Sequence, residues 1–414
     1  MLIEIHLLQN HAPSNLNRDD TGSPKECTFG GTRRARISSQ CLKRSIRRSE
    51  FFQDAFEQSD LGTRTRRLPE LVRERFLQDG HSEDIAKIAA RKASGFGTNE
   101  GKEQAEKNGK FATAQTMFLT QADIAAVTGV LLNAAREAGD AKKFEALKAA
   151  ELQTEARQKG FRPISVDVAL FGRMTTSEAL RDVEATCQVA HALSTHKVDH
   201  EFDYFTAADD LRDSGAESEE DAGADMLGDV EFNSACYYKY FSIDLKGLAD
   251  NLCGANLKGH TPGEADIARA RELASAAVLA LLEGACRVTP SGKQNSFAAH
   301  QLPAAVWIEV RPNRAPVSYA NAFVDAVSPG RDYEAVKAAT GRGADLVASS
   351  LFKLNAHAAA LTTGFDLKSV ARLVLAPEFS DFKPEGMEKI AALGALKERL
   401  RAVMNDGFNT AAGN

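Results

Sequence analysis

The chain has 414 residues, of which 43% are hydrophobic and 26% are charged, and its formal net charge is −6. This length predicts one large elaborated domain or two to three modules. The six cysteines are scattered without a C-x-x-C pair, which favours neither a disulfide framework nor a zinc site and suits a reducing compartment. The N-terminus lacks a basic leader and the chain lacks a long apolar run, so we expect no signal peptide, no membrane span and a cytoplasmic protein.

The first elements follow from alternation and capping. Residues 2–9 alternate between apolar and polar side chains, which predicts a β-strand. Residues 10–32 are rich in Asn, Ser, Pro and Gly and predict a long loop, and loops of that length are usually functional. A helix is expected to start near Ser38, whose side chain can cap its first turn, with Ile37 packing against Leu42.

The rest of the chain alternates between helical and strand patterns. Residues 56–162 have helical periodicity and much alanine, which predicts a helical insertion. Residues 163–174 predict strand structure, residues 183–197 predict a helix, and the acidic tract 214–229 predicts a mobile loop. Further expected elements are strands at 235–245 and 304–312, a long helix at 264–285 and a mainly helical C-terminal part. The class is therefore α+β.

Positive charge is concentrated in one early segment of this acidic chain. Residues 29–48 contain seven Arg or Lys side chains and no acid. On a helix, Gln40, Lys43, Arg44 and Arg47 fall on one stripe, and like charges four residues apart destabilise a helix unless a polyanion lies along it. Two interpretations stay open: the segment binds the phosphates of DNA or RNA, or it is a solvated basic face that pairs with acids elsewhere in the chain.

Other polar residues are weaker candidates. Asp19 and Asp20 are adjacent loop carboxylates that could bind Mg²⁺ or act as acid or base, although such pairs more often form turns. Residues 289–297 form a glycine-containing turn in which Lys293 is either a second phosphate contact or part of a plain surface loop. No P-loop, H-E-x-x-H or G-x-S-x-G motif is present. Three histidines and two aspartates have ligand-like spacing, although core or surface roles are commoner for such residues: His191, His196, His200, Asp199 and Asp203.

Residues 11–48 resemble the N-terminus of the CRISPR-associated CasC family, which supplies the repeated backbone subunit of the type I-E Cascade surveillance complex. Further matches follow in the same order at residues 167–177, 189–211 and 318–323, so the resemblance spans most of the chain. It implies a hand-shaped α+β fold in three parts: an RRM-like (ferredoxin-like) palm of residues 1–55, 163–197 and 233–414, a helical fingers insertion of residues 56–162, and a β-hairpin thumb of residues 198–232 with the acidic loop.

The resemblance also implies an RNA-binding surface. Contacts with the RNA backbone are expected from the loop, the basic segment and one later lysine: Arg18, Lys25, Arg33, Arg34, Arg36, Ser38, Gln40, Lys43, Arg44, Arg47 and Lys293. A thumb or base-wedge role is expected for Met174, Phe205 and Thr206, since a methionine wedge can unstack bases without reading their identity. The implied partners are a CRISPR RNA, target DNA by way of that guide, further copies of the chain and other Cascade subunits.

We therefore predict a non-catalytic scaffold, without cofactor or metal, that polymerises head to tail along a CRISPR RNA guide. A protein that holds a guide RNA must bind its phosphates and sugars independently of sequence, because base pairing with the target supplies the specificity. One alternative is a metal-dependent CRISPR-associated ribonuclease, since related backbone subunits in other CRISPR classes cut target RNA with a loop aspartate; Asp19 or Asp20 would then be catalytic. Another alternative is a DNA-binding assembly protein that binds no RNA.

Overall fold

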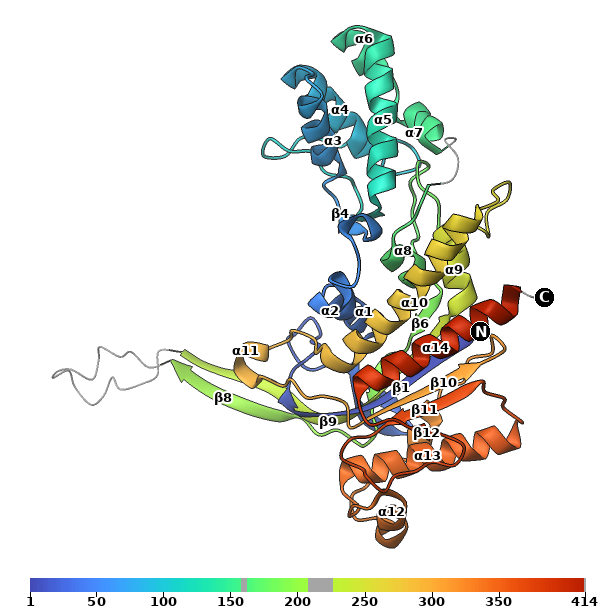
Figure 1. Cartoon of the computed structure of the whole chain (residues 1–414). Helices are drawn as coiled ribbons and strands as arrows, with labels where there is room; N and C mark the ends of the chain where they lie inside the picture. The colour runs from blue at the N-terminus through green and yellow to red at the C-terminus, as the bar shows by residue number, and fades with distance from the viewer. Residues whose placement is uncertain (158–161, 208–225, 413–414) are drawn as a thin grey trace, which may run out of the picture. The chain divides into compact units, whose positions relative to one another are not determined.

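The computed structural model describes residues 1–157, 162–207 and 226–412 (Figure 1). Within the acidic loop predicted at residues 214–229, positions 214–225 lie outside the described residues. By their contacts the residues divide into two units: unit 1 comprises 1–49, 189–242 and 281–414, and unit 2 comprises 50–188 and 243–280. Unit 2 contains the predicted helical insertion together with residues 163–188 and 243–280, which the sequence analysis assigned to the palm.

Unit 1 is built on a mixed sheet in which the strands follow the order β12–β11–β10–β1–β9–β7–β3–β2. Strand β1 pairs antiparallel with β10, β10 pairs antiparallel with β11, and β11 pairs parallel with β12. All residues of β10 are buried, so elements pack against both faces of the sheet. The strand bounds are β1 Leu2–Ser14, β2 Glu26–Phe29, β3 Thr32–Ile37, β7 Ala192–Ser194, β9 Met226–Asp244, β10 Ala305–Arg311, β11 Ala371–Leu375 and β12 Glu388–Lys389.

Helices cover the two faces of this sheet, with α13 (Leu346–Gly364) on one side and α14 (Leu393–Ala412) on the other (Figure 1). Helix α13 packs with α12 (Tyr333–Thr340) and with the 3-10 helix η4 (Ala320–Phe323) over a core that includes Trp307. Among the described residues, no helix has both the length and the apolar character that crossing a membrane requires.

Unit 2 is mainly helical. Its longest helix within the predicted insertion is α5 (Gln121–Ala138), where the Thr120 side chain and Asp123 form a capping box and Gly139 ends the helix in the left-handed conformation. A small antiparallel pair, β4 (Thr63–Thr65) and β5 (Met117–Leu119), adjoins the helices. The other helices are η1 Gln58–Asp60, α2 Glu50–Gln53, α3 Leu68–Gln78, α4 Glu83–Gly95, α6 Ala141–Ala146, α7 Ala149–Arg157, α8 Val166–Phe171, α9 Leu245–Cys253 and α10 Glu264–Arg287, which continues into unit 1.

Three predicted elements are wrong. Residues 163–174 contain α8 instead of a strand, because a helix that is buried around its whole circumference has no solvent face to reveal its period. Residues 183–197 contain β6 (Cys187–Val189) and β7 instead of a helix, since pairing in the sheet overrides the local preference of an alanine-rich run. The loop predicted at 10–32 is shorter, because β1 continues to Ser14 and β2 begins at Glu26.

A buried ionic network links β1, β10 and β11 inside unit 1. The guanidinium of Arg311 pairs with the carboxylates of Glu4 and Glu309, the latter at 2.5 Å. Arg372 approaches Glu309 to 3.2 Å, and the Tyr319 hydroxyl donates to the same carboxylate at 3.0 Å. Because both carboxylates are almost completely buried, each needs these cations to offset the hydration that burial removes.

His6 of β1 lies beside this network and couples the stability of unit 1 to pH. Its ring is fully buried, stacks on Tyr319 with the centroids 4.6 Å apart, and places Nδ1 2.8 Å from the Tyr238 hydroxyl. Burial lowers the pKa of His6 from 6.5 to about 3. The unfolded chain therefore binds a proton below pH 6.5 that the folded chain accepts only near pH 3, so stability falls as the pH drops through this window.

We expect the free energy of unfolding to fall with acidification by about 1.4 kcal/mol more per pH unit in the wild type than in His6→Phe, between about pH 6 and pH 4. Phenylalanine keeps an aromatic ring in the stack but cannot titrate. Denaturant unfolding at several pH values measures both slopes, and parallel pH profiles for the two proteins would contradict the prediction.

Candidate nucleic-acid interface

The basic segment folds as a hairpin followed by a helix, both in unit 1. Strands β2 and β3 pair antiparallel and are joined by Gly30 and Gly31, which have φ values of 59° and 74°. A two-residue hairpin turn with positive φ at both positions matches the twist of its strands, and glycine adopts it most easily. A Cβ at Gly30 would lie 1.8 Å from the Val324 carbonyl oxygen, so the turn packs directly against the backbone.

Helix α1 (Ser39–Arg47) begins where the sequence predicts. The Ser38 hydroxyl accepts a hydrogen bond from the Cys41 amide at 3.3 Å and caps the helix. Ile37 and Leu42 lie in one core cluster as predicted. The predicted stripe lies on the accessible side: Gln40 and Arg44 are exposed and Lys43 and Arg47 are partly exposed. Ser38 itself is only 7% exposed, so its first role is to cap the helix.

Most cations expected to contact RNA lack an acidic partner. In the part of the chain that the structure describes, no carboxylate forms an ion pair with Arg18, Lys25, Lys43, Arg44 or Lys293. The alternative of a basic face neutralised by acids elsewhere in the chain predicts such pairs. Their absence from these five residues favours the interpretation that the face binds an external anion.

Two arginines of the β3 strand have partners within the protein. The Arg33 Nε lies 3.3 Å from a carboxylate oxygen of Glu26, and the Arg33 side chain is 57% exposed. The Arg36 Nε donates to the Glu26 carbonyl at 3.2 Å, and its Nη1 lies 3.1 Å from His191 Nδ1. Both side chains remain at least partly accessible to solvent.

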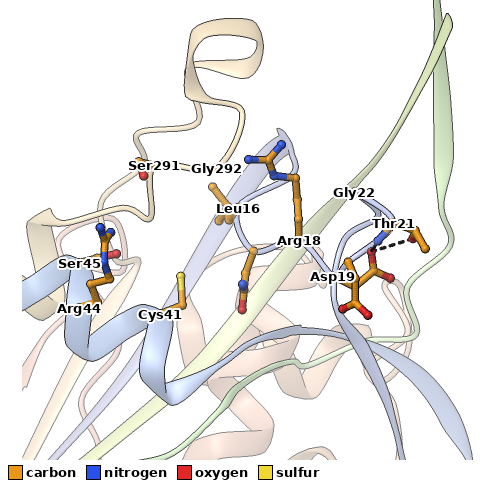
Figure 2. Close-up of a pocket in the computed structure, with 12 residues that line it drawn as sticks. Leu16, Arg18, Asp19, Thr21, Gly22, Cys41, Arg44, Ser45, Ser291 and Gly292 are labelled. Carbon is orange, nitrogen blue, oxygen red and sulfur yellow. Dashed lines mark hydrogen bonds between the residues drawn. The ribbon is translucent and has the colours of Figure 1, made fainter. Parts of the chain in front are cut away.

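A pocket of about 570 Å³ lies where the loop after β1, helix α1 and the segment before α11 (Gln294–Phe297) converge (Figure 2). Arg18 extends from the loop toward Ser291 and Gly292, and Arg44 lines the pocket from α1 (Figure 2). A Cβ at Gly292 would lie 2.5 Å from the carbonyl oxygens of Asn15 and Leu16, so glycine is required for this close approach. The contact places the backbone of the next residue, Lys293, beside the loop that carries Arg18.

Lys293 has a strained backbone at this junction. It is the N-cap residue of α11 and adopts the left-handed conformation with φ at 50°. For a residue other than glycine this conformation costs about 1 kcal/mol, and such strain gathers at functional positions. The structure therefore brings together Arg18, Arg44 and the Lys293 segment, which lie far apart in the sequence.

Asp19 and Asp20 share the lining of the pocket, but the contacts of Asp19 are those of a turn. One carboxylate oxygen of Asp19 accepts hydrogen bonds from the Thr21 amide at 2.9 Å, the Thr21 hydroxyl at 2.8 Å and the Ser23 amide at 3.0 Å. The bond from the Thr21 side chain is the main cause that lowers the pKa of Asp19. This arrangement favours the turn interpretation of Asp19 over an acid–base role.

The structure contradicts the prediction that Arg34 contacts RNA, because this side chain is completely buried. Its guanidinium donates to the carbonyls of Phe29 at 3.2 Å and Thr195 at 2.9 Å, and to those of Phe323 at 2.8 Å and Val324 at 3.2 Å. With its donors engaged by backbone, Arg34 has a structural role. Within a run of arginines, composition alone cannot show which one points inward.

The β8–β9 hairpin carries more exposed aromatic rings than the sequence analysis selected. Strand β8 (Glu201–Ala207) pairs antiparallel with the start of β9. Phe205 is 43% exposed and its ring lies across Gly228, whereas Phe202 and Tyr204, which the sequence analysis missed, are 54% and 80% exposed. The alternation of charged and aromatic residues at positions 201–204 was the available signal. The side chain of Thr206 lies outside the described residues, although its backbone pairs with Leu227.

Met174, in unit 2, is the most exposed large apolar side chain of the described residues, at 94%. Its neighbour Arg173 is buried and pairs with Asp123 at 2.5 Å. Arg173 also forms both backbone hydrogen bonds of a bridge with Val183. The backbone that carries Met174 is therefore fixed while the side chain projects into solvent.

The three histidines with ligand-like spacing do not converge. His191 faces Arg36, His196 accepts from the Cys236 amide at 3.4 Å, and His200 lies between two glutamates. Among the described residues, no group of three or more His, Cys, Asp or Glu side chains is arranged to hold a metal ion.

The model of the CT1975-like protein family matches residues 3–402, so the chain belongs to that family. A chain in a structure titled "CRISPR RNA-guided surveillance complex, pre-nicking" is 28% identical, with a TM-score of 0.75 over 98% of this chain and 100% of that chain. A chain titled "CRISPR RNA-guided surveillance complex" is 23% identical, with a TM-score of 0.65 over 97% and 99%, and shares the fold. No curated protein matches the sequence.

Replacing Arg34 by methionine should lower the free energy of unfolding by about 3 kcal/mol or more, because several buried carbonyls lose their donor. Denaturant unfolding measures the loss. Arg33→Met is the matched control, since an exposed ion pair contributes about 1 kcal/mol at most. A small, equal loss in both variants would contradict the structural role of Arg34.

Proposed function

We propose that this member of the CT1975-like protein family is a non-catalytic RNA-binding scaffold. In this proposal copies of the chain assemble head to tail along a CRISPR RNA and present it for pairing with target DNA, as the backbone subunit of a type I-E Cascade surveillance complex. The match over almost the whole length to a chain of a CRISPR RNA-guided surveillance complex supports this assignment.

The observation that carries the proposal is the set of cations without acidic partners around the pocket. Arg18 and Arg44 line it, the strained Lys293 segment adjoins it, and Lys43 continues the positive face along α1. The guanidinium groups of arginine and the ammonium groups of lysine bind phosphate strongly. Each phosphate that they bind releases counterions, whatever the base sequence is.

A subunit that binds a guide RNA needs to contact the RNA backbone without recognising the bases. The aromatic side chain within residues 29–48 is Phe29, and the Arg34 guanidinium lies 5.7 Å from the centroid of its ring. Base-reading RRM surfaces instead present free aromatic rings to stacked bases. Guide pairing would supply the specificity of the complex.

The finer parts of the proposal assign roles to the projecting apolar groups. Met174 and the β8–β9 hairpin with Phe205 and Thr206 would contact the guide held by a neighbouring copy. A fixed backbone under an exposed methionine supports a wedge role, because an apolar side chain on a rigid base can separate stacked bases. Head-to-tail contacts between identical copies produce open filaments, which fits assembly along a linear guide.

The absence of catalysis is part of the proposal. The turn contacts of Asp19 support it, because an oxygen that already accepts three hydrogen bonds is poorly placed to take up Mg²⁺. The competing ribonuclease would use Asp19 or Asp20 and would shorten a bound RNA in the presence of Mg²⁺.

Arg18→Ala combined with Arg44→Ala should weaken binding to single-stranded RNAs of different sequence to a similar extent. It should also reduce the slope of log affinity against log salt by about 0.7 for each phosphate that the variant no longer binds, or about 1.4 in total. Fluorescence anisotropy over a salt series measures both quantities. Lys368→Ala with Arg401→Ala is the matched control, because it removes two exposed cations of unit 1 that form no ion pair in the described part of the chain. An unchanged slope in the first double variant would argue against the phosphate grip.

Sedimentation of the purified protein with a CRISPR RNA, an unrelated RNA of equal length and a duplex DNA, all with Mg²⁺, should yield multi-copy complexes on intact single-stranded RNA. Met174→Gly should leave the protein folded but change the distribution of assembled species. RNA that is shortened by the wild type and left intact by Asp19→Asn with Asp20→Asn would establish the ribonuclease instead, and complexes on duplex DNA alone would indicate the DNA-binding alternative.

A further inference from the structure

Asn17 is a neutral hydrogen-bonding residue in the lining of the pocket that Arg18 and Arg44 share (Figure 2). Its Oδ1 accepts a hydrogen bond at 2.8 Å from the main-chain amide of Ser38, the N-cap residue of α1. Because a main-chain amide can only donate, the oxygen of the Asn17 side chain must face Ser38 and the nitrogen must point elsewhere. The start of α1 therefore determines which end of the Asn17 side chain is left for another partner.

The Nδ2 group of Asn17 carries two N–H donors, and no atom of the described residues accepts from them. Asn17 is partly exposed, and its Nδ2 is not among the buried side-chain atoms that lack a partner. A ligand in the pocket can therefore reach this nitrogen.

Main-chain hydrogen bonds hold the Arg18 loop independently of the side chain at position 17. The Asn17 carbonyl accepts from the Lys25 amide at 2.8 Å, and the Lys25 carbonyl accepts from the Arg36 amide of β3 at 2.8 Å. Arg18 and Pro24 form a further antiparallel bridge across the loop. A substitution of Asn17 leaves these bonds in place, so loss of its amide group can be separated from displacement of Arg18.

We propose that Asn17 is an RNA-binding residue, whose Nδ2 donates to a phosphate oxygen of the RNA that Arg18 and Arg44 hold. The oxygens of a phosphodiester only accept hydrogen bonds, and asparagine is among the residues that commonly contact the backbone of nucleic acids. Because the contact with Ser38 already fixes the amide, little side-chain freedom is lost on binding. This inference rests on the proposed function, since it adds a neutral donor to the surface that would hold RNA.

A neutral donor differs from a cation in its response to salt. A cation that neutralises a phosphate releases counterions, whereas the uncharged amide of Asn17 releases none. Removal of the amide should therefore weaken RNA binding by the same factor at every salt concentration. The slope of log affinity against log salt should stay that of the wild type, in contrast to the slope expected after loss of Arg18 and Arg44.

Fluorescence anisotropy of the full-length protein with a labelled single-stranded RNA over a salt series tests the proposal. Asn17→Leu, which is similar in size but has no amide, should bind about tenfold more weakly with the wild-type slope. Asn17→Asp keeps an oxygen that can accept from the Ser38 amide, but it replaces the donor by a negative charge. This second variant should bind more weakly than Asn17→Leu, because the carboxylate also repels the phosphate.

Asn313→Asp is the matched control for the added charge. Asn313 is an exposed residue of unit 1 and does not line the pocket. It follows β10 near the start of β1, since Arg311 pairs with Leu2, whereas Asn17 follows the other end of β1. A strand of 13 residues is about 40 Å long, so this variant should bind RNA as the wild type does.

Wild-type affinity in both Asn17→Leu and Asn17→Asp would overturn the proposal. Weaker binding by Asn17→Asp alone would also overturn it, because the added charge would then explain the whole loss. A slope reduced by about 0.7 in Asn17→Leu would overturn it as well, since that change indicates loss of a cationic contact. Failure of the wild type to bind single-stranded RNA would overturn the proposed function and the phosphate contact together, and it is detected before any variant is compared.

Discussion

The basic surface depends on one buried guanidinium. Arg34 ties the β2–β3 turn to the end of β7 and to η4 through hydrogen bonds to backbone carbonyls of all three segments. A buried cation is tolerable here because its donors are engaged, and the geometry is fixed because carbonyls from three separate segments must meet one planar group. The neighbouring arginines can then point outward from a rigid hairpin. The buried Arg34 thus fixes the hairpin from which the neighbouring arginines reach solvent.

Close approach of backbones completes the surface. Gly30 contacts the Val324 carbonyl and Gly292 contacts those of Asn15 and Leu16, at distances that exclude any side chain. The Gly292 contact brings residues 291 and 292 to the pocket that the loop after β1 and helix α1 also line. Arg18 and Arg44 line that pocket beside Asp19 and Asp20, and neither arginine forms an ion pair with a carboxylate in the described part of the chain.

Local signals predicted much of the architecture. The alternation in residues 2–9, the cap at Ser38 and the periodicity of residues 264–285 correspond to β1, α1 and α10. Prediction failed at residues 163–174 and 183–197, where burial on all sides and pairing in the sheet decided the outcome. It failed also at Arg34, because burial of one arginine among several depends on partners about 160 and 290 positions away, such as Thr195 and Phe323.

The sequence by itself determined where the positive charge is concentrated, which residues can cap or turn the backbone, and the resemblance on which the proposed RNA scaffold is based. Those properties are local, because charge, alternation and turn chemistry involve residues a few positions apart. Only the tertiary structure decided which cations remain without acidic partners, which one is buried, and that Lys293 lies beside the Arg18 loop. It alone placed His200 between Glu26 and Glu231. Such relations depend on contacts between distant segments, which packing of the whole unit creates and no local pattern encodes.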